Sequence, residues 1–584
     1  MATVIAQPLA SQSHFELEIQ GLAAGTVSVA GFDSEDHVLS GDYRLRIQVI
    51  AATNLELPRV LGAQAGLSMR WSGDLCRIRG VISHVSAAGS TPQGPAYVLV
   101  LSSPLWGLKQ ARHNRVYLNK TVLDIVRELL ASNEWQAQDF DLQAKGSYPA
   151  REFVAQYEES DYDFLSRQLA YHGLFFAFRH AADRTQLVIH DELDALAELL
   201  GAVPLPYQVQ TGQSRTSETV FALRRRLELK TSHVCLKDYN DQAPERLLHL
   251  SEHCAGALSA RGEDYRYGEH YGDDEEGGRI ARIRQQAIEW QRDTIVAESD
   301  CRGLQPGMRL SLTRHPEAAL NGDWLVVEVE HHGDQAAGFA YGDKPKGLTY
   351  SNRLLLIRAG TPYRSAYEPW RRQIYGSFNA KIEGDGGDYA YLDEHGRYRL
   401  RLPWDLGDAA SGQASHPVRL MQPYGGERYG LHFPLHHGAE VAVSFVNGDI
   451  DRPFILGALS NPAQPSPVTA ATDFLVKAAE NVRLTAESAD IDLRAGKDMI
   501  VQTGADLSVE VRTGDATVLV DQGKFELEAA SAITFKGQGG GVIHIGQGAG
   551  AIEISEDGDF TVNAPKVEIN AASIAIKGQT ISNN

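Results

Sequence analysis

Two pairs of adjacent histidines have the residue type that binds metal ions. They are His331–His332 and His436–His437. Neighbouring residues on a strand point to opposite faces of a sheet, so the two members of either pair are badly placed to hold one ion. We therefore predict that neither pair is a metal site.

His544 lies in the segment GVIHIG, where three copies of one histidine would meet if the side chain pointed toward an axis shared by three chains. Alternation along a strand places Ile543 and Ile545 on one face and His544 on the other. If the isoleucines face inward, the histidine faces solvent. The sequence thus predicts no axial metal.

Paired carboxylates at Glu158–Glu159 and at Asp161/Asp163 have the residue type used for acid–base chemistry and glycoside hydrolysis. Their context instead indicates the start of a helix, where acidic side chains interact favourably with the helix dipole. We predict a structural role for them.

The cysteines offer little further chemistry. Cys254 follows His253, but chain neighbours rarely align as nucleophile and base, which favours a structural role. The four cysteines are far apart and form no CxxC pair, which is typical of reduced thiols made in the cytoplasm and argues against zinc. HExxH, GxSxG, the phosphate-binding loop and GxGxxG in a βαβ setting are all missing. We predict no catalytic residue, no cofactor and no enzyme.

The length of the chain indicates how many domains it has, and its charge indicates which partners it disfavours. The chain has 584 residues, which suggests about three to five domains. Its formal net charge of -20 argues against nucleic-acid binding, which calls for a basic surface. The N-terminal residues lack the pattern of a signal peptide, and no apolar run is long enough for a membrane span.

The N-terminal part mixes strands and helices. HFELEIQ, YRLRIQVI and AYVLVLSS are rich in strand-forming residues. Apolar spacing predicts a helix over 120–133 with Thr121 as its cap, and a second over 160–171, which starts at Ser160 or Asp161 and ends at Gly173. A charged helix is expected near 279–293. This part is expected to be α+β, with two interleaved β-barrel-like domains.

A compact β module follows, at 374–459. Its five to seven short strands fit a small OB-type barrel, set between linkers at 361–373 and 460–468. The structural residues predicted for this module are Asp393, Gly396 and Arg397, which shape a turn, and Pro403 and Trp404, which are core and strand-end residues. Trp404 is also a candidate for a seam between copies of the chain. Asn447–Gly448 predicts a hairpin turn.

Short apolar pairs, two residues apart, recur along residues 474–584. Successive pairs are mostly about seven to nine residues apart, with small or polar residues between them. The last three pairs are Phe560/Val562, Val567/Ile569 and Ile574/Ile576. A repeat that buries only two or three side chains cannot offset the entropy cost of its ordering, about 1–2 kcal/mol per residue for the backbone. The repeats must stack.

The spacing of the pairs favours a prism in which three chains share one apolar axis. About a dozen layers, at about 4.8 Å each, would make a rod about 60 Å long. The alternative is an antiparallel meander within one chain, which is disfavoured because strands of about three residues are too short for a stable sheet.

Three ordered motifs resemble the VgrG (valine-glycine repeat) spikes of type VI secretion systems. They are REFVAQYEESDYDFLSRQLAYHGLFFAF (151–178), HPEAALNGDWLVVEVEHHG (315–333), and the OB segments LDEHGRYRLRLPWD (392–405), VRLMQPYGGERYGLHFPLHHGAEVAVSFVNGDIDRP (418–453) and ILGALSNP (455–462). The resemblance implies phage-hub-like α+β domains at 1–370, an OB-fold domain at 371–460, a linker at 461–473 and an intertwined triple-stranded β-helical needle at 474–584.

The resemblance also implies the partners. These are two further copies in a homotrimer, the Hcp tube, baseplate proteins, a PAAR-type tip protein, an effector with or without an adaptor chaperone, and, transiently, a target membrane. The apparatus would assemble in the cytoplasm, and the spike would then be secreted into target cells. The residues predicted to dock the tip protein or effector are Lys577, Gly578, Gln579, Thr580, Ile581, Ser582, Asn583 and Asn584.

The sequence departs from the family pattern in two ways, and both argue against an enzymatic domain. Only about a dozen residues separate the OB module from the needle, too few for the lysozyme domain seen in some tail spikes. No sequence follows the needle, so a C-terminal effector domain is not expected and cargo would be carried non-covalently. Two alternatives remain open: a hub-spike of a phage or extracellular contractile particle, and a wall-degrading enzyme.

Overall fold

The structure of the chain is a computed structural model. It describes residues 14–71, 74–181, 183–210, 217–254, 261–335, 349–368, 373–384, 390–426, 429–431, 433–465, 476, 482–485, 490–537 and 542–582. The chain divides into two compact units, Met1–Val476 and Lys477–Asn584. No helix in the described ranges is long and apolar enough to cross a membrane.

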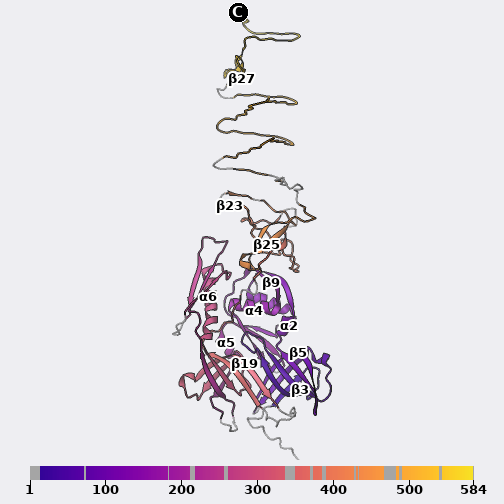
Figure 1. Ribbon diagram of the computed structural model, residues 1–584, viewed down its shortest axis with the longest axis vertical. Helices are drawn as coiled ribbons and strands as arrows, with labels where there is room; N and C mark the ends of the chain where they lie inside the picture. Colours follow the sequence, from indigo (N-terminus) through magenta and orange to yellow (C-terminus); the bar gives the residue numbers. More distant parts are fainter. Residues whose placement is uncertain are drawn as a thin grey trace, which may run out of the picture. The chain divides into compact units, whose positions relative to one another are not determined.

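The largest sheet of the first unit has twelve strands (Figure 1). Ten of them follow the order β1-β4-β5-β6-β3-β2-β19-β20-β17-β13, and β18 pairs with β19 and β12. The strands are β1 (His14–Ile19), β2 (Val27–Glu35), β3 (Arg44–Ala51), β4 (Gln64–Trp71), β5 (Asp74–Thr91), β6 (Gly94–Ser102), β12 (Ala202–Pro206), β13 (Val220–Leu227), β17 (Asp293–Ser299), β18 (Arg309–Thr313), β19 (Gly322–Asp334) and β20 (Thr349–Arg358). The β2–β19 pairing joins segments about 300 residues apart in the sequence, with Asp33 opposite His332.

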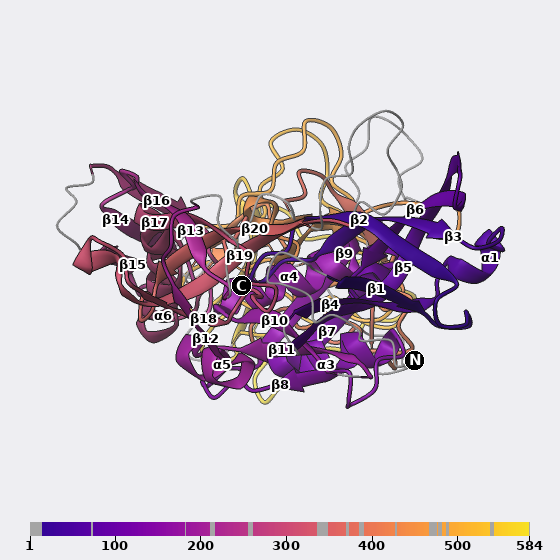
Figure 2. The same cartoon turned by 90° about the horizontal axis from the view of Figure 1, so that it is seen from below.

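Three smaller sheets complete the N-terminal part. They are the ribbon of β7 (Arg112–Lys120) and β9 (Arg151–Ser160), the sheet of β8 (Phe140–Leu142), β10 (Phe175–His180) and β11 (Thr185–His190), and the sheet of β14 (His233–Asp238), β15 (Leu248–His253) and β16 (Glu263–Tyr267). In Figure 2, β14–β16 lie toward one end of this unit, whereas β3 and β6 lie toward the other.

Helices are fewer than strands in the described ranges, so the predicted mainly β fold is confirmed. The helices are α1 (Leu57–Val60), α2 (Trp106–Gln110), α3 (Val122–Ser132), α4 (Asp161–His172), α5 (Leu193–Leu200) and α6 (Asp274–Glu289), with 3-10 turns η1 (Trp290–Arg292), η2 (Ala318–Leu320) and η4 (Val446–Gly448).

The predicted helix ends agree closely with the structure for α3 and α4. Thr121 caps α3 by accepting a hydrogen bond from the Asp124 N–H, and Ser160 caps α4 in the same way through the Asp163 N–H. Gly173 ends α4 in the left-handed conformation at φ +78°. The third predicted helix starts earlier than expected, at Asp274, because Asp273 caps it.

The OB module forms a four-stranded sheet in the order β22-β21-β25-β26, with a separate hairpin β23–β24. The strands are β21 (Phe378–Ile382), β22 (Leu400–Arg401), β23 (Gly425–Gly426), β24 (Tyr429–Gly430), β25 (Glu440–Phe445) and β26 (Pro453–Ala458). The apolar core of this module also includes Phe153 and Ala155 of β9, so it packs directly on the N-terminal domains.

Residues 361–368, predicted as part of a linker, have no regular secondary structure but are anchored. Tyr363 and Tyr367 are both buried. The Tyr363 hydroxyl donates to the Leu39 carbonyl at 2.7 Å, and the Trp290 indole N–H donates to the Arg364 carbonyl at 3.1 Å. This part of the predicted linker therefore lies against the N-terminal domains.

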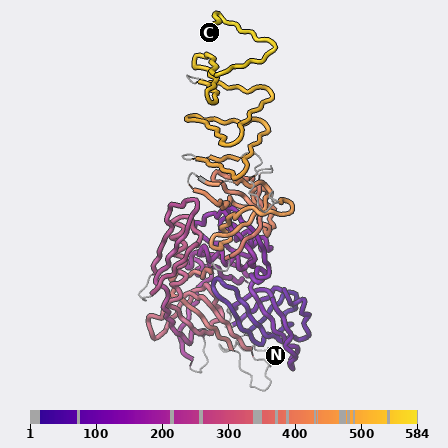
Figure 3. The backbone as a smooth tube through the Cα atoms, turned by 45° about the horizontal axis from the view of Figure 1, so that its top comes forward, coloured from indigo at the N-terminus to yellow at the C-terminus, as the bar shows by residue number. Residues whose placement is uncertain are grey.

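In the second unit, residues 490–537 contain no strand or helix. In Figure 3 the orange-to-yellow trace before β27 swings back and forth in open loops. The strands described in this unit are β27 (Ile543–Gln547), β28 (Gly550–Ile554) and β29 (Phe560–Asn563), which form an antiparallel sheet in that order.

The β27–β29 sheet corrects one prediction. Residues 543–563 were expected to continue the stacked repeats, but they form a meander within one chain. Its strands have four or five residues, longer than the three assumed, and turns with positive φ at Gly548 and Gly558 connect them. Apolar residues two apart are compatible with stacked repeats and with a meander. In this segment the two glycine turns favour the meander.

Candidate functional site: an apolar assembly surface and a charged domain junction

Apolar side chains are exposed along most of the second unit. Ile500 is 84% exposed, Val509 80% and Leu519 79%. The predicted needle-core residues Phe560, Val562, Val567, Ile569, Ile574 and Ile576 are all exposed by 42% or more. So many exposed apolar side chains in one segment indicate an interaction site, because exposed apolar side chains in soluble proteins are usually scattered singly.

The backbone of the same unit has unused bonding capacity. Within residues 490–537, no backbone–backbone hydrogen bond is described. Extended chain with open N–H and C=O groups is a template for pairing with other strands. The second unit therefore offers both apolar side chains and backbone hydrogen-bond groups to a partner.

The predicted docking residues are accessible where the structure describes them. Lys577, Gly578, Gln579, Thr580, Ile581 and Ser582 are exposed, and Ile581 is 62% exposed. Asn583 and Asn584 lie outside the described residues. The structure does not bring these residues together into a pocket, so their docking role stays a prediction.

His544 lies on β27 directly opposite Glu553 of β28, and its Nδ1 is 2.7 Å from a Glu553 carboxylate oxygen. On either side of this pair, Ile543 lies opposite Ile554 and Ile545 lies opposite Ile552. The cross-strand pairs therefore alternate between polar and apolar, as the sequence predicted for this segment. The described contact of His544 is an exposed ion pair.

In the pair His331–His332, the two side chains have different environments. His331 is buried and its Nδ1 lies 2.6 Å from the Tyr350 hydroxyl, whereas His332 is exposed and lies 2.6 Å from Asp33. His436 and His437 are both exposed.

The acidic residues near α4 hold the fold together. Asp161 is fully buried; its carboxylate accepts hydrogen bonds from Gln156 and Asn133 and lies 3.0 Å from His113 Nδ1. Glu159 forms an ion pair with Arg167 at 2.6 Å. These contacts agree with the structural role predicted for the carboxylate pairs.

A thiol–imidazole contact exists, but not where the sequence suggested one. Cys235 Sγ lies 3.0 Å from His249 Nε2 across β14 and β15. No contact between Cys254 and His253 side chains is described. Burial raises the pKa of the Cys235 thiol, and a hydrogen bond to Glu263 adds to this effect, so the thiol is not activated as a nucleophile.

The predicted turn residues of the OB module have structural contacts. Gly396 adopts φ +73°. The Asp393 carboxylate accepts from the backbone N–H groups of His395 and Arg397 and from the Arg397 side chain at 2.7 Å. Burial opposes ionisation of Asp393, but these hydrogen bonds outweigh it and lower the pKa of the carboxyl.

Pro403 and Trp404 differ from each other. Pro403 is exposed, so its predicted core position is wrong; the chain turns after Leu402, which is buried. Trp404 is half-buried and its ring lies 5.3 Å from that of Tyr157 on β9. Trp404 also packs against the apolar core of the OB module, so its described contacts lie within the same chain.

Charged side chains join the OB module to the N-terminal domains. Arg452 donates two hydrogen bonds to Asp238, each of 2.7 Å, and the Asp238 side chain is fully buried. Arg419 pairs with Asp241 at 3.0 Å. Burial disfavours the charged form of Arg452, but the bonds to Asp238 and its charge raise the pKa of the guanidinium. A bidentate, largely desolvated pair of this kind fixes orientation.

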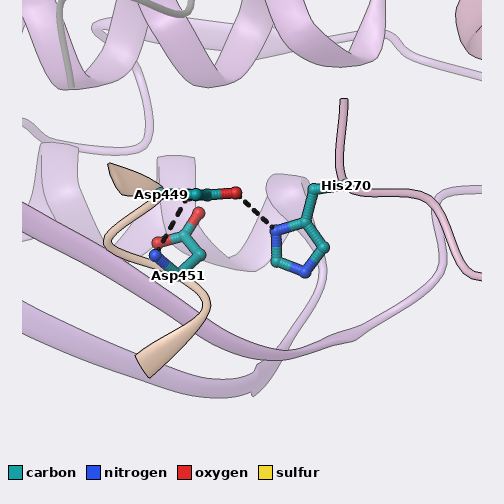
Figure 4. A group of neighbouring side chains, drawn as sticks. All are labelled: His270, Asp449 and Asp451. Carbon is teal, nitrogen blue, oxygen red and sulfur yellow. Dashed lines mark hydrogen bonds and ion pairs between the residues drawn. The ribbon is translucent and has the colours of Figure 1, made fainter. Parts of the chain in front are cut away.

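Beside this pair, His270 approaches two aspartates of the OB module. His270 Nδ1 lies 3.2 Å from Asp449 Oδ2, and Asp449 accepts a hydrogen bond from the Asp451 N–H (Figure 4). Asp451 accepts a hydrogen bond from the Ala155 N–H at 2.8 Å. The two aspartates follow the predicted Asn447–Gly448 turn, where φ is +54° and +73°. Sequence analysis identified the turn but not this contact, because His270 lies 179 residues earlier in the chain.

Comparison with known protein families gives a match over more than half of the chain. Residues 37–337 match the family described as phage tail baseplate hub (GPD). The chain belongs to this family. Residues 389–459 match a second family, the type VI secretion system/phage-baseplate injector OB domain. The junction around Arg452 and His270 therefore joins the hub region to the injector OB region.

Related sequences carry the VgrG name, and the predicted resemblance is confirmed. The chain is 29% identical over 468 residues to the actin cross-linking toxin VgrG1 of Vibrio cholerae, covering 78% of this chain and 42% of that protein. It is 29% identical to the type VI secretion system spike protein VgrG3 of Vibrio cholerae, covering 78% and 45%, respectively. The chain thus spans about half the length of these relatives.

Solved structures share the fold. An E. coli protein, c3393, described as a component of the type VI secretion system with structural similarity to the T4 tail proteins gp27 and gp5, matches with a TM-score of 0.56 and 23% identity, covering 76% of this chain and all of that one. A chain of the Francisella PdpA–VgrG complex matches with a TM-score of 0.51 and 10% identity, covering 78% of this chain and 79% of that one. The chain has a hub and OB architecture of the phage-tail type.

Proposed function

We propose that this chain forms the trimeric spike of a type VI secretion apparatus, which punctures a target membrane and carries cargo on its C-terminal segment. The observation that carries the proposal is the exposed apolar face of the second unit. Full burial of a Val, Leu, Ile or Phe side chain contributes about 1.5–3 kcal/mol. Many such side chains lie along residues 482–576, so association along this surface is strongly favoured.

Three copies suit this surface better than two. Each apolar pair covers only one narrow face, and the pairs are separated by short polar turns. Three such faces can close around one axis, and the open backbone groups then pair between chains. An intertwined triple-stranded β-helix built in this way has no free lateral edge and resists load along its axis.

The hub domains and the C-terminal segment would bind different partners. We assign the hub to contacts with an Hcp-type tube and baseplate proteins, and residues 577–584 to a PAAR-type tip protein, an effector or its adaptor. The spike would assemble in the cytoplasm, contact the target membrane transiently and enter the target cell. The net charge of -20 disfavours nucleic acid as a partner.

The proposed role is mechanical, not catalytic. The carboxylate pairs of the hub act in capping and ion pairing, and Cys235 has a raised thiol pKa. One relative is named as an actin cross-linking toxin, but the match covers 42% of that protein. We infer that chemistry delivered by this spike comes from the carried protein.

A second function has one observation in its favour. The family that covers residues 37–337 is described from phage tails, so a hub-spike of a phage or of an extracellular contractile particle would have the same fold. The tube protein that binds the hub separates the two functions.

The proposal is tested with the full-length protein. We expect a particle with three times the 63.9 kDa mass of the chain, in which residues 490–582 resist protease. Pull-downs compare this protein with a variant truncated after residue 559. An Hcp tube should bind both, whereas a PAAR-type protein or effector should bind only the full-length form. A monomer with a protease-sensitive C-terminal unit would overturn the proposal, and wall hydrolysis abolished by one carboxylate substitution would favour an enzyme.

A further inference from the structure

We propose that His270, Asp449 and Asp451 bind a divalent metal ion that links the hub to the OB module. One donor atom from each side chain lies within 4.8 Å of the other two. In the part of the chain that the structure describes, this is the one group of three His, Cys, Asp or Glu side chains that meets this distance. Metal–ligand bonds of about 2.0–2.2 Å hold neighbouring donors about 3–4 Å apart, so shifts of about 1 Å would complete the site.

The backbone already holds His270 in position. Its N–H donates to Asp238 Oδ2 at 2.5 Å, and its carbonyl accepts from the Tyr171 hydroxyl at 2.8 Å. Its φ is +65°, a left-handed conformation that non-glycine residues rarely adopt. Strained residues held by surrounding bonds cluster at functional sites.

The two aspartates are fixed just as firmly, on the opposite side of the junction. Asp449 and Asp451 are 7% and 4% exposed. Asp449 Oδ1 accepts the Asp451 N–H at 3.1 Å, and Asp451 Oδ1 accepts the Ala155 N–H at 2.8 Å. These bonds orient both carboxylates, and they leave Asp449 Oδ2 facing the imidazole (Figure 4).

The imidazole suits a metal ligand. The Nδ1 atom of His270 is buried, and its 3.2 Å approach to Asp449 is not a well-directed hydrogen bond. A buried nitrogen in this state calls for an explanation, and a bound ion between it and the carboxylate is one.

The surroundings give the ion space and access. A cleft of about 340 Å³ is lined by His270 and Asp451, together with Arg151, Glu276 and Arg452. Arg452 directs two nitrogens to Asp238 at 2.7 Å, and its Nε lies farther from Asp449 Oδ2, at 3.8 Å. Arg151 lies 3.8 Å from Glu276, so the shorter contacts of Arg452 and this contact of Arg151 are with carboxylates outside the three ligands. The cleft leaves room for water as a further ligand.

The donor set selects the class of ion. One imidazole and two carboxylates suit Zn²⁺ or Mn²⁺ better than Ca²⁺, which takes six to eight oxygen ligands. Since His270 belongs to the hub region and both aspartates to the OB region, the ion would resist separation of these two regions.

The experiment uses full-length protein dialysed against a chelator. Calorimetric titration with Zn²⁺ or Mn²⁺ alone, and elemental analysis after gel filtration, should give one ion per chain. His270→Asn keeps a residue that tolerates positive φ, and Asp449→Asn keeps the shape of the turn; each should weaken binding by about 100-fold. The matched control is His332→Asn, which removes an exposed hub histidine paired with Asp33.

Thermal unfolding provides a second measurement for variants that fold less well. The ion should raise the unfolding temperature of the wild type and of His332→Asn, but not that of His270→Asn or Asp449→Asn. The proposal would be overturned if the wild type bound less than one ion per chain. It would also be overturned if both site variants kept the wild-type affinity for the ion, or if His332→Asn lost as much affinity as they do. None of these results depends on the trimeric state or on tube binding.

Discussion

The hub with its OB module buries its apolar side chains, whereas the C-terminal unit exposes them. In the hub, Phe164, Leu129 and Val126 are fully buried, within a continuous core. In the C-terminal unit, Ile500, Val509 and Leu519 are almost as exposed as in an unfolded chain. The first region can fold with its own residues. The second has apolar side chains typical of a core, and in the proposed trimer the other chains would bury them.

The difference follows from how each sequence is arranged. Hub strands have up to 18 residues and alternate with amphipathic helices, so one chain can cover both faces of a sheet. The repeats of residues 490–537 are too short for this, and their backbone groups are open. We therefore expect stability in the two regions to have different sources. In the hub it comes from contacts between distant parts of one chain, and in the repeats of the proposed trimer it would come from contacts between chains.

The largest expected effect comes from charging the repeat surface. Leu507→Asp combined with Val509→Asp would bury carboxylates on the shared axis, where each unpaired charge costs several kcal/mol. We expect the trimer to dissociate, measured by light scattering, while hub unfolding is unchanged. The control Ser508→Asp changes the residue between them, which alternation places on the other face. A trimer that survives the double substitution would show that these residues do not form the interface.

A smaller effect is expected at the junction between the hub and the OB module. Arg452→Ala leaves the buried Asp238 carboxylate without its bidentate partner, and breaking such a pair costs about 3–5 kcal/mol. Chemical denaturation should show this loss in the first unit, with the trimer unaffected.

The control for the junction is Arg353→Ala, which removes an exposed ion pair with Glu330. Exposed pairs contribute about 0–1 kcal/mol. Similar losses in both variants would mean that the Arg452–Asp238 pair has no special role in joining the two regions.

The smallest expected effect is a pH dependence of hub stability that comes from His331. Burial lowers the pKa of His331 from 6.5 to about 4, so the folded hub keeps this ring neutral while the unfolded chain takes up a proton. Stability should therefore fall as the pH drops from about 6.5 to about 4, by at most about 1.4 kcal/mol per pH unit for this group. His331→Gln should reduce this slope in denaturant titrations of the hub. The exposed His332→Gln should leave it unchanged, and equal slopes in wild type and His331→Gln would contradict the assignment.

Local patterns were predictable because their causes lie within a few residues. Thr121 caps the start of α3, Ser160 and Gly173 mark the two ends of α4, and Asn447–Gly448 favours a turn. Each depends on a cap or on a positive φ that only certain residue types supply.

Contacts between distant residues were not predictable. Nothing near His270 in the sequence indicates that it lies 3.2 Å from Asp449, and Cys235 contacts His249 through a strand register that the sequence does not specify. The exposed position of Pro403 depends on the path of the chain after Leu402. The period of the apolar pairs could not separate stacked repeats from a meander, because both place residues i and i+2 on one face.

The β27–β29 meander has a consequence for how copies of the chain align. Nearly identical repeats pair almost as well after one chain slides by a full repeat, so a long repetitive interface is degenerate in register. Residues 543–563 break this degeneracy, since their hydrogen bonds are made within one chain and their shape differs from the neighbouring repeats. A slipped copy would set a meander against an open repeat. The segment that departs from the pattern would thus act as an alignment mark for the segments that follow it.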